Sequence, residues 1–236
     1  MWNNNELREC LDDFLDVYSR RPIDQNHGGG LSVNNFYVYF ALNKLQPKYV
    51  LESGVFQGLG TWLIEQTVPG VKLVCIDPLL HQVVYKSNNA KYITNDFLSF
   101  TNDNISRDRA RDTLIYFDDH QNQFERIKHA HMLGFKHLIW DDNYPEYKGQ
   151  RHLSLQACIN KLSDPGYNIP FEASSVLSDV LDEYYIFPPV LQYTEPVSME
   201  KSYIDGTPIL DTWDEKYQVF DDDMHNYRWT TYTKLK

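Results

Sequence analysis

Two pairs of adjacent aspartates are the residues of this chain best suited to chemistry. Asp118 and Asp119 follow one apolar run, and Asp141 and Asp142 follow a later one. Parallel strands bring their carboxyl ends to one edge of a sheet, where ligands bind, so we expect the two pairs to meet there. Close carboxylates repel one another unless a cation lies between them. Oxygen ligands of this kind favour Mg²⁺, or Mn²⁺ or Ca²⁺, over zinc.

Each of these acids also has a plain structural interpretation. Asp118 and Asp119 could cap the helix expected after them. The stretch from Asp141 to Pro145 could be an ordinary turn, and His120 could be a solvated residue in the first turn of a helix. These alternatives stay open at the level of sequence.

A glycine-containing segment with the spacing E-x-G-x-x-x-G-x-G precedes the acids. It begins at Glu52, continues through Gly54, Gly58 and Gly60, and opens a helical pattern, after which a second apolar run ends in Asp77. A strand, a glycine turn, a helix and a strand with a terminal acid form a nucleoside-binding half-fold. Its glycines let the backbone approach the ligand, and the acid accepts hydrogen bonds from ribose hydroxyls. A strand–turn–helix unit without a ligand is the alternative.

The position of the first acid narrows the choice of nucleoside. Dinucleotide sites usually read G-x-G-x-x-G and place a pyrophosphate at a helix N-terminus. Glu52 at the loop entrance would repel a pyrophosphate, whereas it suits a ligand with a cationic amino-acid end, such as S-adenosylmethionine. The spacing therefore argues against an NAD-linked oxidoreductase.

The same loop resembles the first motif of the class I S-adenosylmethionine-dependent methyltransferases. The resemblance implies that Glu52 and the three glycines bind that cofactor and that Asp77 is the ribose-binding acid. Asp96, after the third expected strand, would hydrogen-bond the adenine amino group, or would be an exposed loop acid. Asp118 would also belong to the cofactor-binding residues.

The aspartate pairs carry a second, narrower resemblance. The segments 117–120 and 138–144 look like the metal site of the macrocin-type sugar O-methyltransferases and of the cephalosporin-hydroxylase-like group. This resemblance implies that Asp118, Asp141 and Asp142 bind Mg²⁺ and that His120 is the general base. Relatives often carry Asp at the base position, so the chain departs from the pattern there, and Asp119 is the second candidate for either role.

The elements that must position these residues follow from hydrophobic periodicity. Helices are predicted over 6–18, 32–45, 121–133, 153–162 and 174–185, with Ser32 as an N-cap. Strands are predicted from 49 and over 71–76, 92–94, 112–117 and 137–140, and 217–220 with 227–233 should form an antiparallel hairpin around Asp221–Asp223. The predicted fold is α/β and Rossmann-like: a mostly parallel, twisted sheet, helices on both faces and a C-terminal antiparallel hairpin.

We expect one methyltransferase domain over residues 1–236. Within it, 1–47 would supply N-terminal helices and a glycine-rich segment, 24–30, which is either a lid or a linker. Residues 48–145 would form the cofactor- and metal-binding core, 146–212 the acceptor-binding insertion and 213–236 the hairpin. Lys148, Arg151 and His152 are candidates for contacts with the acceptor.

Composition limits the partners. The net charge of −11, from 22 basic and 33 acidic residues, argues against a duplex nucleic-acid substrate. No apolar run approaches the ~20 residues of a membrane span. The three cysteines are far apart and are interpreted as reduced thiols of a cytoplasmic protein. The expected partner is a small-molecule or glycan acceptor, with a homodimer as a further possibility.

The combined prediction is an S-adenosylmethionine-dependent O-methyltransferase, assisted by Mg²⁺ (or Mn²⁺ or Ca²⁺), that acts on a sugar or glycoside hydroxyl. A metal ion lowers the pKa of a poorly acidic hydroxyl, and a nearby His can accept its proton. Two alternatives remain: a catechol or small-phenol O-methyltransferase with the same acids, and a non-catalytic Rossmann-like binding module.

Overall fold

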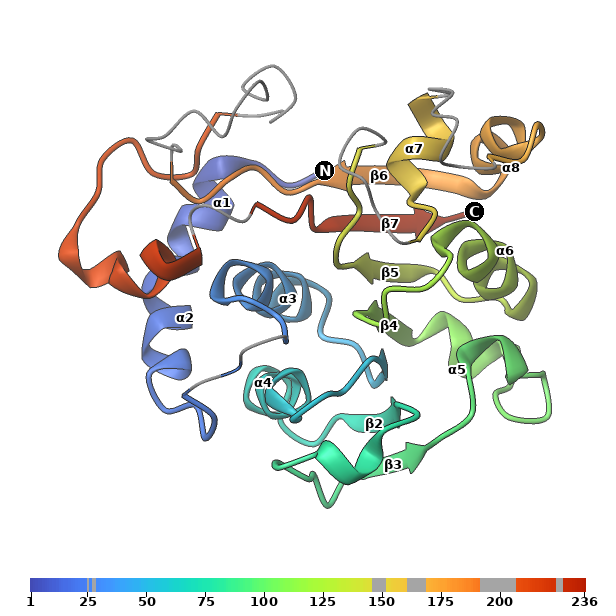
Figure 1. The fold of residues 1–236 in the computed structure, drawn as a ribbon, viewed down its shortest axis with the longest axis horizontal. Helices are drawn as coiled ribbons and strands as arrows, with labels where there is room; N and C mark the ends of the chain where they lie inside the picture. Colours follow the sequence, from blue (N-terminus) through green and yellow to red (C-terminus); the bar gives the residue numbers. More distant parts are fainter. Residues whose placement is uncertain (25, 27–28, 146–151, 161–168, 192–206, 224–226) are drawn as a thin grey trace.

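The fold is a seven-stranded sheet with helices on both faces (Figure 1). The structure is a computed structural model, and it describes all residues except 25, 27–28, 146–151, 161–168, 192–206 and 224–226. The strands are β1 (Tyr49–Ser53), β2 (Lys72–Ile76), β3 (Ala90–Ile93), β4 (Thr113–Phe117), β5 (His137–Trp140), β6 (Leu181–Ile186) and β7 (Thr231–Leu235). Their order is β3-β2-β1-β4-β5-β7-β6, with β1 to β5 parallel and β7 antiparallel to both of its neighbours. The predicted fold class is confirmed.

Helices alternate with the parallel strands as predicted. They are α1 (Asn4–Glu9), α2 (Leu11–Tyr18), α3 (Ser32–Leu45), α4 (Leu59–Thr67), α5 (Arg107–Arg111), α6 (Gln123–Leu133), α7 (Leu155–Asn160) and α8 (Ala173–Val180), with 3-10 segments η1 (Leu80–Gln82), η2 (Phe97–Ser99) and η4 (Glu215–Asp223). In Figure 1, α3 and α4 cover one face of the sheet, and α5 and α6 cover the other. No helix of the described residues is both long and apolar enough to cross a bilayer.

Strand register aligns the chemically interesting residues at one edge. Ser53 at the end of β1 pairs with Ile76 at the end of β2 and with Phe117 at the end of β4. Phe117 in turn pairs with Trp140 at the end of β5. The residues that follow these four strand ends therefore emerge side by side, as expected for parallel strands.

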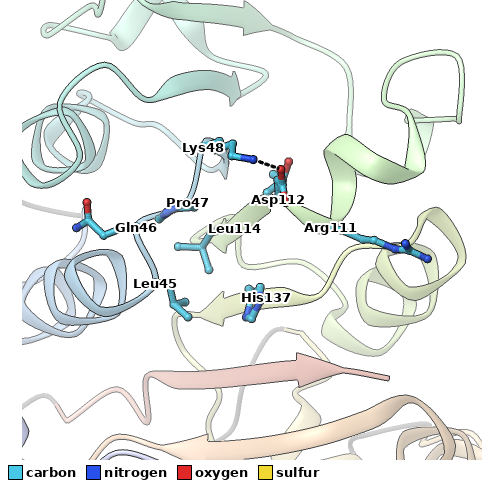
Figure 2. Close-up of a pocket in the computed structure, with 9 residues that line it drawn as sticks. Leu45, Gln46, Pro47, Lys48, Arg111, Asp112, Leu114 and His137 are labelled. Carbon is cyan, nitrogen blue, oxygen red and sulfur yellow. Dashed lines mark hydrogen bonds and ion pairs between the residues drawn. The ribbon is translucent and has the colours of Figure 1, made fainter.

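The opposite, amino-terminal edge of the sheet has a small cavity and an exposed ion pair. A cavity of about 190 Å³ lies there, between the end of α3 and the start of β4, and Figure 2 shows the residues that line it. Lys48 and Asp112 form an ion pair of 2.8 Å at its rim, and both side chains are largely exposed. An exposed pair of this kind contributes little to stability.

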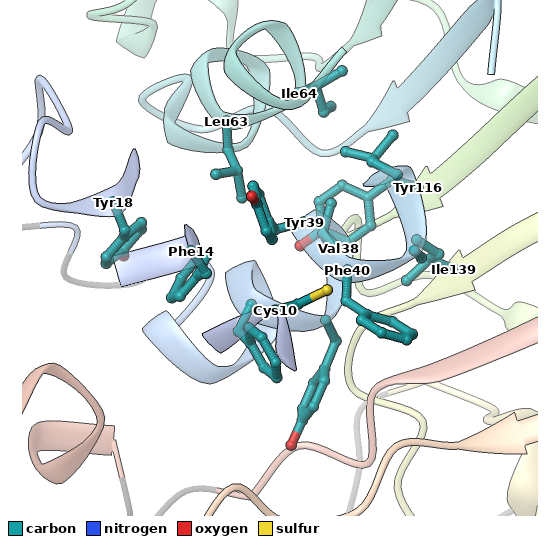
Figure 3. Packing of buried hydrophobic residues seen from close by; sticks show 14 of the residues in the cluster. Cys10, Phe14, Tyr18, Val38, Tyr39, Phe40, Leu63, Ile64, Tyr116 and Ile139 are labelled. Atoms are coloured by element: carbon teal, nitrogen blue, oxygen red, sulfur yellow. The ribbon is translucent and has the colours of Figure 1, made fainter. Parts of the chain in front are cut away.

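The core on the α3 face is rich in aromatic rings (Figure 3). Phe14 of α2 lies 5.4 Å from Phe36 of α3, measured between ring centroids. Leu63 and Ile64 of α4 and Tyr116 of β4 belong to the same cluster. Because α3 lies between the sheet and the other helices, it is buried on almost all sides, which explains its weak amphipathic pattern.

Cys10, Cys75 and Cys158 are buried and free of disulfides. Burial raises the pKa of Cys158 to about 12, so this thiol behaves as a small apolar core residue.

Two predictions near the N-terminus need correction. The single helix expected over 6–18 is two helices, because Cys10 caps α1 and starts α2 with backbone angles that interrupt the first helix. The N-cap of α3 is Leu31, not Ser32, and Ser32 donates its hydroxyl to the carbonyl of Val219.

The C-terminal antiparallel pair exists, but its first strand was assigned wrongly. β7 pairs with β6, whose residues were expected to continue the preceding helix, whereas 217–220 lie in η4. Tyr217 and Phe220 are both buried at a spacing of three, which is the 3-10 repeat and not the strand repeat of two. The side chains of Asp221–Asp223 lie outside the described residues.

Candidate functional site

The loop after β1 is pressed against neighbouring backbone at two glycines. Gly54 and Gly58 have φ angles of +96° and +94°. A Cβ atom at Gly54 would lie 2.2 Å from the carbonyl oxygen of Asp118, and one at Gly58 would lie 2.3 Å from that of Tyr85. Both positions therefore require glycine for conformation and for space.

Asp77 holds this loop in place. Its carboxylate accepts hydrogen bonds from the backbone N–H groups of Val55 (2.8 Å), Phe56 (3.0 Å) and Leu79 (2.7 Å). Phe56 has a positive φ of 46°, which is uncommon for a residue with a side chain. Asp77 is thus a structural acid of the loop, and its predicted role in ribose binding stays a prediction.

A cavity of about 380 Å³ lies at the carboxyl ends of β1, β2 and β4. It brings together five of the residues singled out in the sequence. Its lining consists of Ser53, Gly54, Ile76, Asp77, Pro78, Thr94, Asn95, Asp96, Asp118, Asp119, Gln121 and Arg126. The size and position suit a nucleoside-sized ligand at the edge where such ligands bind in open parallel sheets.

Arg126 of α6 organises two of the acids around this cavity, and the sequence analysis missed it. Its side chain is only 3% exposed and donates to Asp119 (2.8 and 3.0 Å) and to Asp96 (2.8 Å). Burial alone would raise the pKa of Asp96, but hydrogen bonds from Arg126 and from the N–H of Leu98 lower it. The sequence did contain a signal for this role. Arg126 is a charged residue between the apolar Phe124 and Ile127, in the helix that follows the aspartates.

Asp118 and Asp141 form a second group with the opposite electrostatics. Asp141 is buried, Asp118 is half-buried at the wall of the cavity, and the two carboxyl groups are hydrogen-bonded to each other. Burial raises the pKa of Asp118 to about 7, and burial together with the nearby Asp142 charge raises the pKa of Asp141 well above its usual value. The shared hydrogen bond requires a proton because two ionised carboxylates cannot donate to each other.

Asn34 of α3 completes this group and was also missed. Its side-chain N–H donates to Asp141 and, over 3.0 Å, to Thr230. Its Oδ1 atom is buried and has no hydrogen-bond partner among the described residues. The amide group of Asn34 therefore brings a further oxygen atom to the side of Asp141, where its nitrogen is already bound. The signal was a pair of adjacent asparagines, Asn34 and Asn35, that are both buried at the start of a helix whose middle is apolar.

Asp142 and His120 face each other across the loops after β5 and β4. His120 Nε2 lies 2.7 Å from Asp142 Oδ2, and both residues have a φ of +52°. The hydrogen bond to Asp142 raises the pKa of His120 and outweighs the opposing effect of burial. Burial would raise the pKa of Asp142, but His120 and Arg228, whose guanidinium lies 3.3 Å away, lower it. The left-handed backbone conformation is unfavourable for residues other than glycine. Because His120 and Asp142 both adopt it and contact each other, the surrounding structure must hold them in place, as is common at functional sites.

Glu52 is directed into the protein. Its carboxyl group is buried and accepts a hydrogen bond from the hydroxyl of Thr61, and the Cys75 thiol lies 3.5 Å away. Burial raises the pKa of Glu52 to about 8. A Cβ atom at Gly60 would lie 2.3 Å from Glu52 Oε1, so this glycine gives the carboxyl group its room. Glu52 also borders a cavity of about 20 Å³ that Gly30, from the glycine-rich segment, helps to close.

The expected acceptor contacts are only partly described. His152 is buried, its Nε2 atom lies 3.2 Å from the backbone carbonyl of Asp142, and its ring lies 6.0 Å from the ring of His120. Burial lowers the pKa of His152. Lys148 and Arg151 lie outside the described residues. Within the described part of the chain, no group of three or more His, Cys, Asp and Glu side chains has the arrangement of a ready-made metal site.

Comparison with known proteins supports the fold. No protein-family model and no curated protein sequence matches the chain. A solved structure described as a "putative O-methyltransferase" from Klebsiella pneumoniae is 12% identical, covers 99% of this chain and 96% of its own, and has a TM-score of 0.53. An O-methyltransferase from Bacillus cereus in complex with SAH is 13% identical, with coverages of 100% and 93% and a TM-score of 0.49. The protein CmcI with Mg and SAM is 17% identical, with coverages of 73% and 76% and a TM-score of 0.46. Only the first likeness is strong enough to use, and it establishes a shared fold.

Proposed function

We propose that this chain is an S-adenosylmethionine-dependent O-methyltransferase, assisted by a divalent metal ion, that acts on a sugar or glycoside hydroxyl. The observation that carries the proposal is the position of Asp118. It borders the 380 Å³ cavity together with Gly54 and Asp77, and it is hydrogen-bonded to Asp141. A methyl donor in the cavity would therefore lie next to the carboxyl pair. A fold shared with a putative O-methyltransferase supports the reaction class.

The residues around the cavity suit S-adenosylmethionine. Asp77 and Asp96 offer carboxylate oxygens for the ribose and adenine groups at one side of the cavity. Glu52 and Asp118 border the small adjoining cavity at the other side, whose volume of about 20 Å³ would hold only the ammonium group at the amino-acid end of the donor. A positive ligand group near Glu52 would stabilise its ionised form, whose burial is otherwise unfavourable. S-Adenosylmethionine would supply a methyl group bound to a positively charged sulfonium, which becomes a neutral thioether when the methyl group is transferred to the acceptor oxygen.

The oxygen donors around Asp141 suit a divalent cation. Asp118 and Asp141 are paired carboxyl groups that need either a proton or a cation between them, and the amide oxygen of Asn34, whose nitrogen contacts Asp141, has no partner among the described residues. Asp118 and Asp141 would hold the ion, with Asn34 as a further ligand. Asp142, already paired with His120 and Arg228, would join them by exchanging one of these partners. Such an ion, when bound, lowers the pKa of a hydroxyl group that contacts it.

His120 is the better placed of the two candidate bases. Its side chain is half-exposed, and its ring is held by Asp142, 2.7 Å from Nε2, and by the backbone of Asp118; to take a proton from an incoming hydroxyl, Nε2 would exchange Asp142 for the acceptor. Asp119 instead accepts two hydrogen bonds from Arg126, so its carboxylate is already neutralised. We therefore assign the base role to His120 and a positioning role to Asp119.

The test compares Asp141→Ala with the wild-type protein. Methyl transfer from S-adenosylmethionine to a panel of monosaccharide glycosides is read by mass, and S-adenosylhomocysteine binding is measured by calorimetry with and without Mg²⁺. We expect the substitution to lower turnover about 10³-fold, because the metal stabilises the reacting oxygen by several kcal/mol. Affinity for S-adenosylhomocysteine should change less than about threefold, since Asp141 does not border the cavity.

Three outcomes would overturn parts of the proposal. Full activity of Asp141→Ala, or of the wild-type protein in excess EDTA, would remove the metal ion from the mechanism. Methylation of catechols but not of glycosides would replace the acceptor class and leave the metal assignment intact. Cofactor binding without turnover on either class of acceptor would indicate a binding module.

A further inference from the structure

A second large cavity lies toward the amino-terminal edge of the sheet, and none of the residues of the candidate functional site lines it. Its volume is about 490 Å³. Its floor is formed by the first residues of β1 and β2, including Tyr49, Leu51 and Val74, and its roof includes Phe100 and Ile105 from the connection between β3 and β4. Along β1, Leu51 at the near end of this cavity is three residues, or about 10 Å, from Gly54.

The cavity exists because this part of the sheet is thinly covered. Register places Tyr49 opposite Lys72, Leu51 opposite Val74, and Val74 opposite Lys91. Alternation along the strands puts these side chains on one face of the sheet. Over β4 and β5 the same face is packed against α6, whereas over β1 to β3 the connection contributes only the short segments η2 and α5 among the described residues (Figure 1).

Every charged residue that lines the cavity is a cation. These residues are Lys72, Lys91 and Arg109, and no Asp or Glu lines it. None of the three cations forms an ion pair within the described part of the chain, and the Arg109 guanidinium lies 5.0 Å from the centroid of the Tyr49 ring. The chain as a whole has a net charge of −11. The surroundings of this apolar cavity are instead positively charged, because its three charged residues are all cations without an ion-pair partner among the described residues.

We propose that this cavity is a second ligand site, which takes a small organic anion with a flat apolar body. The floor and roof would bury the body between Val74 and Ile105, and Lys72 and Lys91 at the rim would pair with its carboxylate, sulfonate or phosphate group. A volume of about 490 Å³ is in the usual range for small-molecule sites. The inference does not depend on the proposed methyl transfer, because the two cavities share no lining residue.

The test uses 2-naphthoate as the probe and the neutral 2-naphthalenemethanol as its uncharged counterpart, both titrated by calorimetry into the full-length protein. We expect saturable 2-naphthoate binding with a Kd below about 1 mM and an affinity at least tenfold higher than that of the alcohol. The double variant Lys72→Gln/Lys91→Gln should lose that tenfold preference and keep the weak affinity for the alcohol. Val74→Phe, which fills the cavity without changing charge, should weaken both ligands.

A matched control separates the effect of the lining lysines on 2-naphthoate affinity from the effect of the protein's net charge. Lys86→Gln/Lys128→Gln has the same net charge as the first double variant, and neither residue lines the cavity. It should bind 2-naphthoate within about twofold of the wild-type protein. The proposal is wrong if the wild-type protein does not bind 2-naphthoate, if both ligands bind equally, or if the control pair loses as much affinity as the lining pair. It also fails if a folded Val74→Phe variant binds 2-naphthoate normally.

Discussion

Asp118 and Asp119 are neighbours in the sequence, yet their carboxyl groups lie in opposite electrostatic surroundings. Asp119 shares the buried guanidinium of Arg126 with Asp96, which forms a cluster of two acids and one cation. Asp118 instead meets a second acid, Asp141, and no cation lies between them. Below, these are called the neutralised cluster (Asp96, Asp119 and Arg126) and the acid pair (Asp118 and Asp141).

The difference leads us to expect that the neutralised cluster stabilises the fold and that the acid pair is suited to binding a ligand. In the neutralised cluster, hydrogen bonds from the guanidinium lower the pKa of Asp96 against the effect of burial. In the acid pair, burial and like charge raise the pKa of both groups. Proteins seldom keep buried like charges together without a functional reason, and perturbed titration in a cleft is typical of functional sites. Changes to the two groups should therefore have opposite effects on stability.

The largest effect is expected from Gly54→Ala, because it disturbs both groups at once. The added Cβ would lie 2.2 Å from the Asp118 carbonyl oxygen and 2.9 Å from the Asp119 nitrogen. We expect the free energy of unfolding to fall by about 4 kcal/mol. Gly70→Ala is the control, because Gly70 also has a positive φ but has nothing within 4 Å of its Cβ position. It should cost only about 1 kcal/mol in urea unfolding, and similar losses for both variants would contradict the account.

Arg126→Met should destabilise the protein by about 3 kcal/mol at pH 7, because it leaves the mostly buried Asp119 without a cation. Urea unfolding at several pH values measures the effect. The pKa of Asp96 is lowered in the folded protein, so its contribution to stability is present above its unfolded pKa and is lost as pH falls. The deficit of the variant should therefore shrink below about pH 4. A deficit that is independent of pH would indicate lost packing and not lost charge.

Asp141→Asn should have the opposite sign. It replaces a buried carboxyl group whose pKa is raised well above its usual value, so the folded protein no longer has to hold a proton that the unfolded chain has lost. In buffer with EDTA at pH 8 we therefore expect the free energy of unfolding to rise by about 2 kcal/mol. The folded pKa of Asp118 is about 7, above its ordinary value of 3.8, so wild-type stability should fall as pH rises between these values. The variant should show a flatter profile. Destabilisation by Asp141→Asn in EDTA would mean that the acid pair stabilises the fold.

Glu52→Gln is expected to have the smallest effect and tests a third buried acid, which has neither a cation nor an acid partner. The ordinary pKa of Glu52 is 4.5 and its folded pKa is about 8. Between these values the folded protein holds a proton that the unfolded chain has lost, so stability falls as pH rises. The variant should lack part of this fall when urea unfolding of the two proteins is compared between pH 5 and pH 8. Parallel pH profiles for both proteins would show that Glu52 is ionised in the fold.

Much of this architecture could be predicted from sequence because parallel strands leave strong local signals. The apolar runs 72–76, 113–117 and 137–140 end in acids, and their carboxyl ends must meet at one edge. The antiparallel end of the sheet was harder to predict. Strand β6 lies at the edge with mixed polar and aromatic residues and is paired on one side only, so its pattern resembled the end of a helix.

The partners of each acid could not be predicted from sequence. Asn34 and Arg228 reach Asp141 and Asp142 from segments 107 and 86 residues away. Arg126 is closer, but its choice of Asp119 over Asp118 depends on which side of β4 each carboxylate faces. Adjacent residues at the end of a strand direct their side chains to opposite faces of the sheet. Composition and spacing do not reveal which face each side chain takes.

The most direct test is a titration of Mn²⁺, followed by electron paramagnetic resonance, into the wild-type protein and two matched variants at pH 7.5. Asp141→Asn alters the acid pair, and Asp119→Asn alters the neutralised cluster by the same change of charge. The account predicts one bound ion in the wild-type protein, a loss of affinity of at least about 100-fold in Asp141→Asn and near-normal affinity in Asp119→Asn. Equal losses in the two variants, or an unchanged affinity in Asp141→Asn, would contradict it.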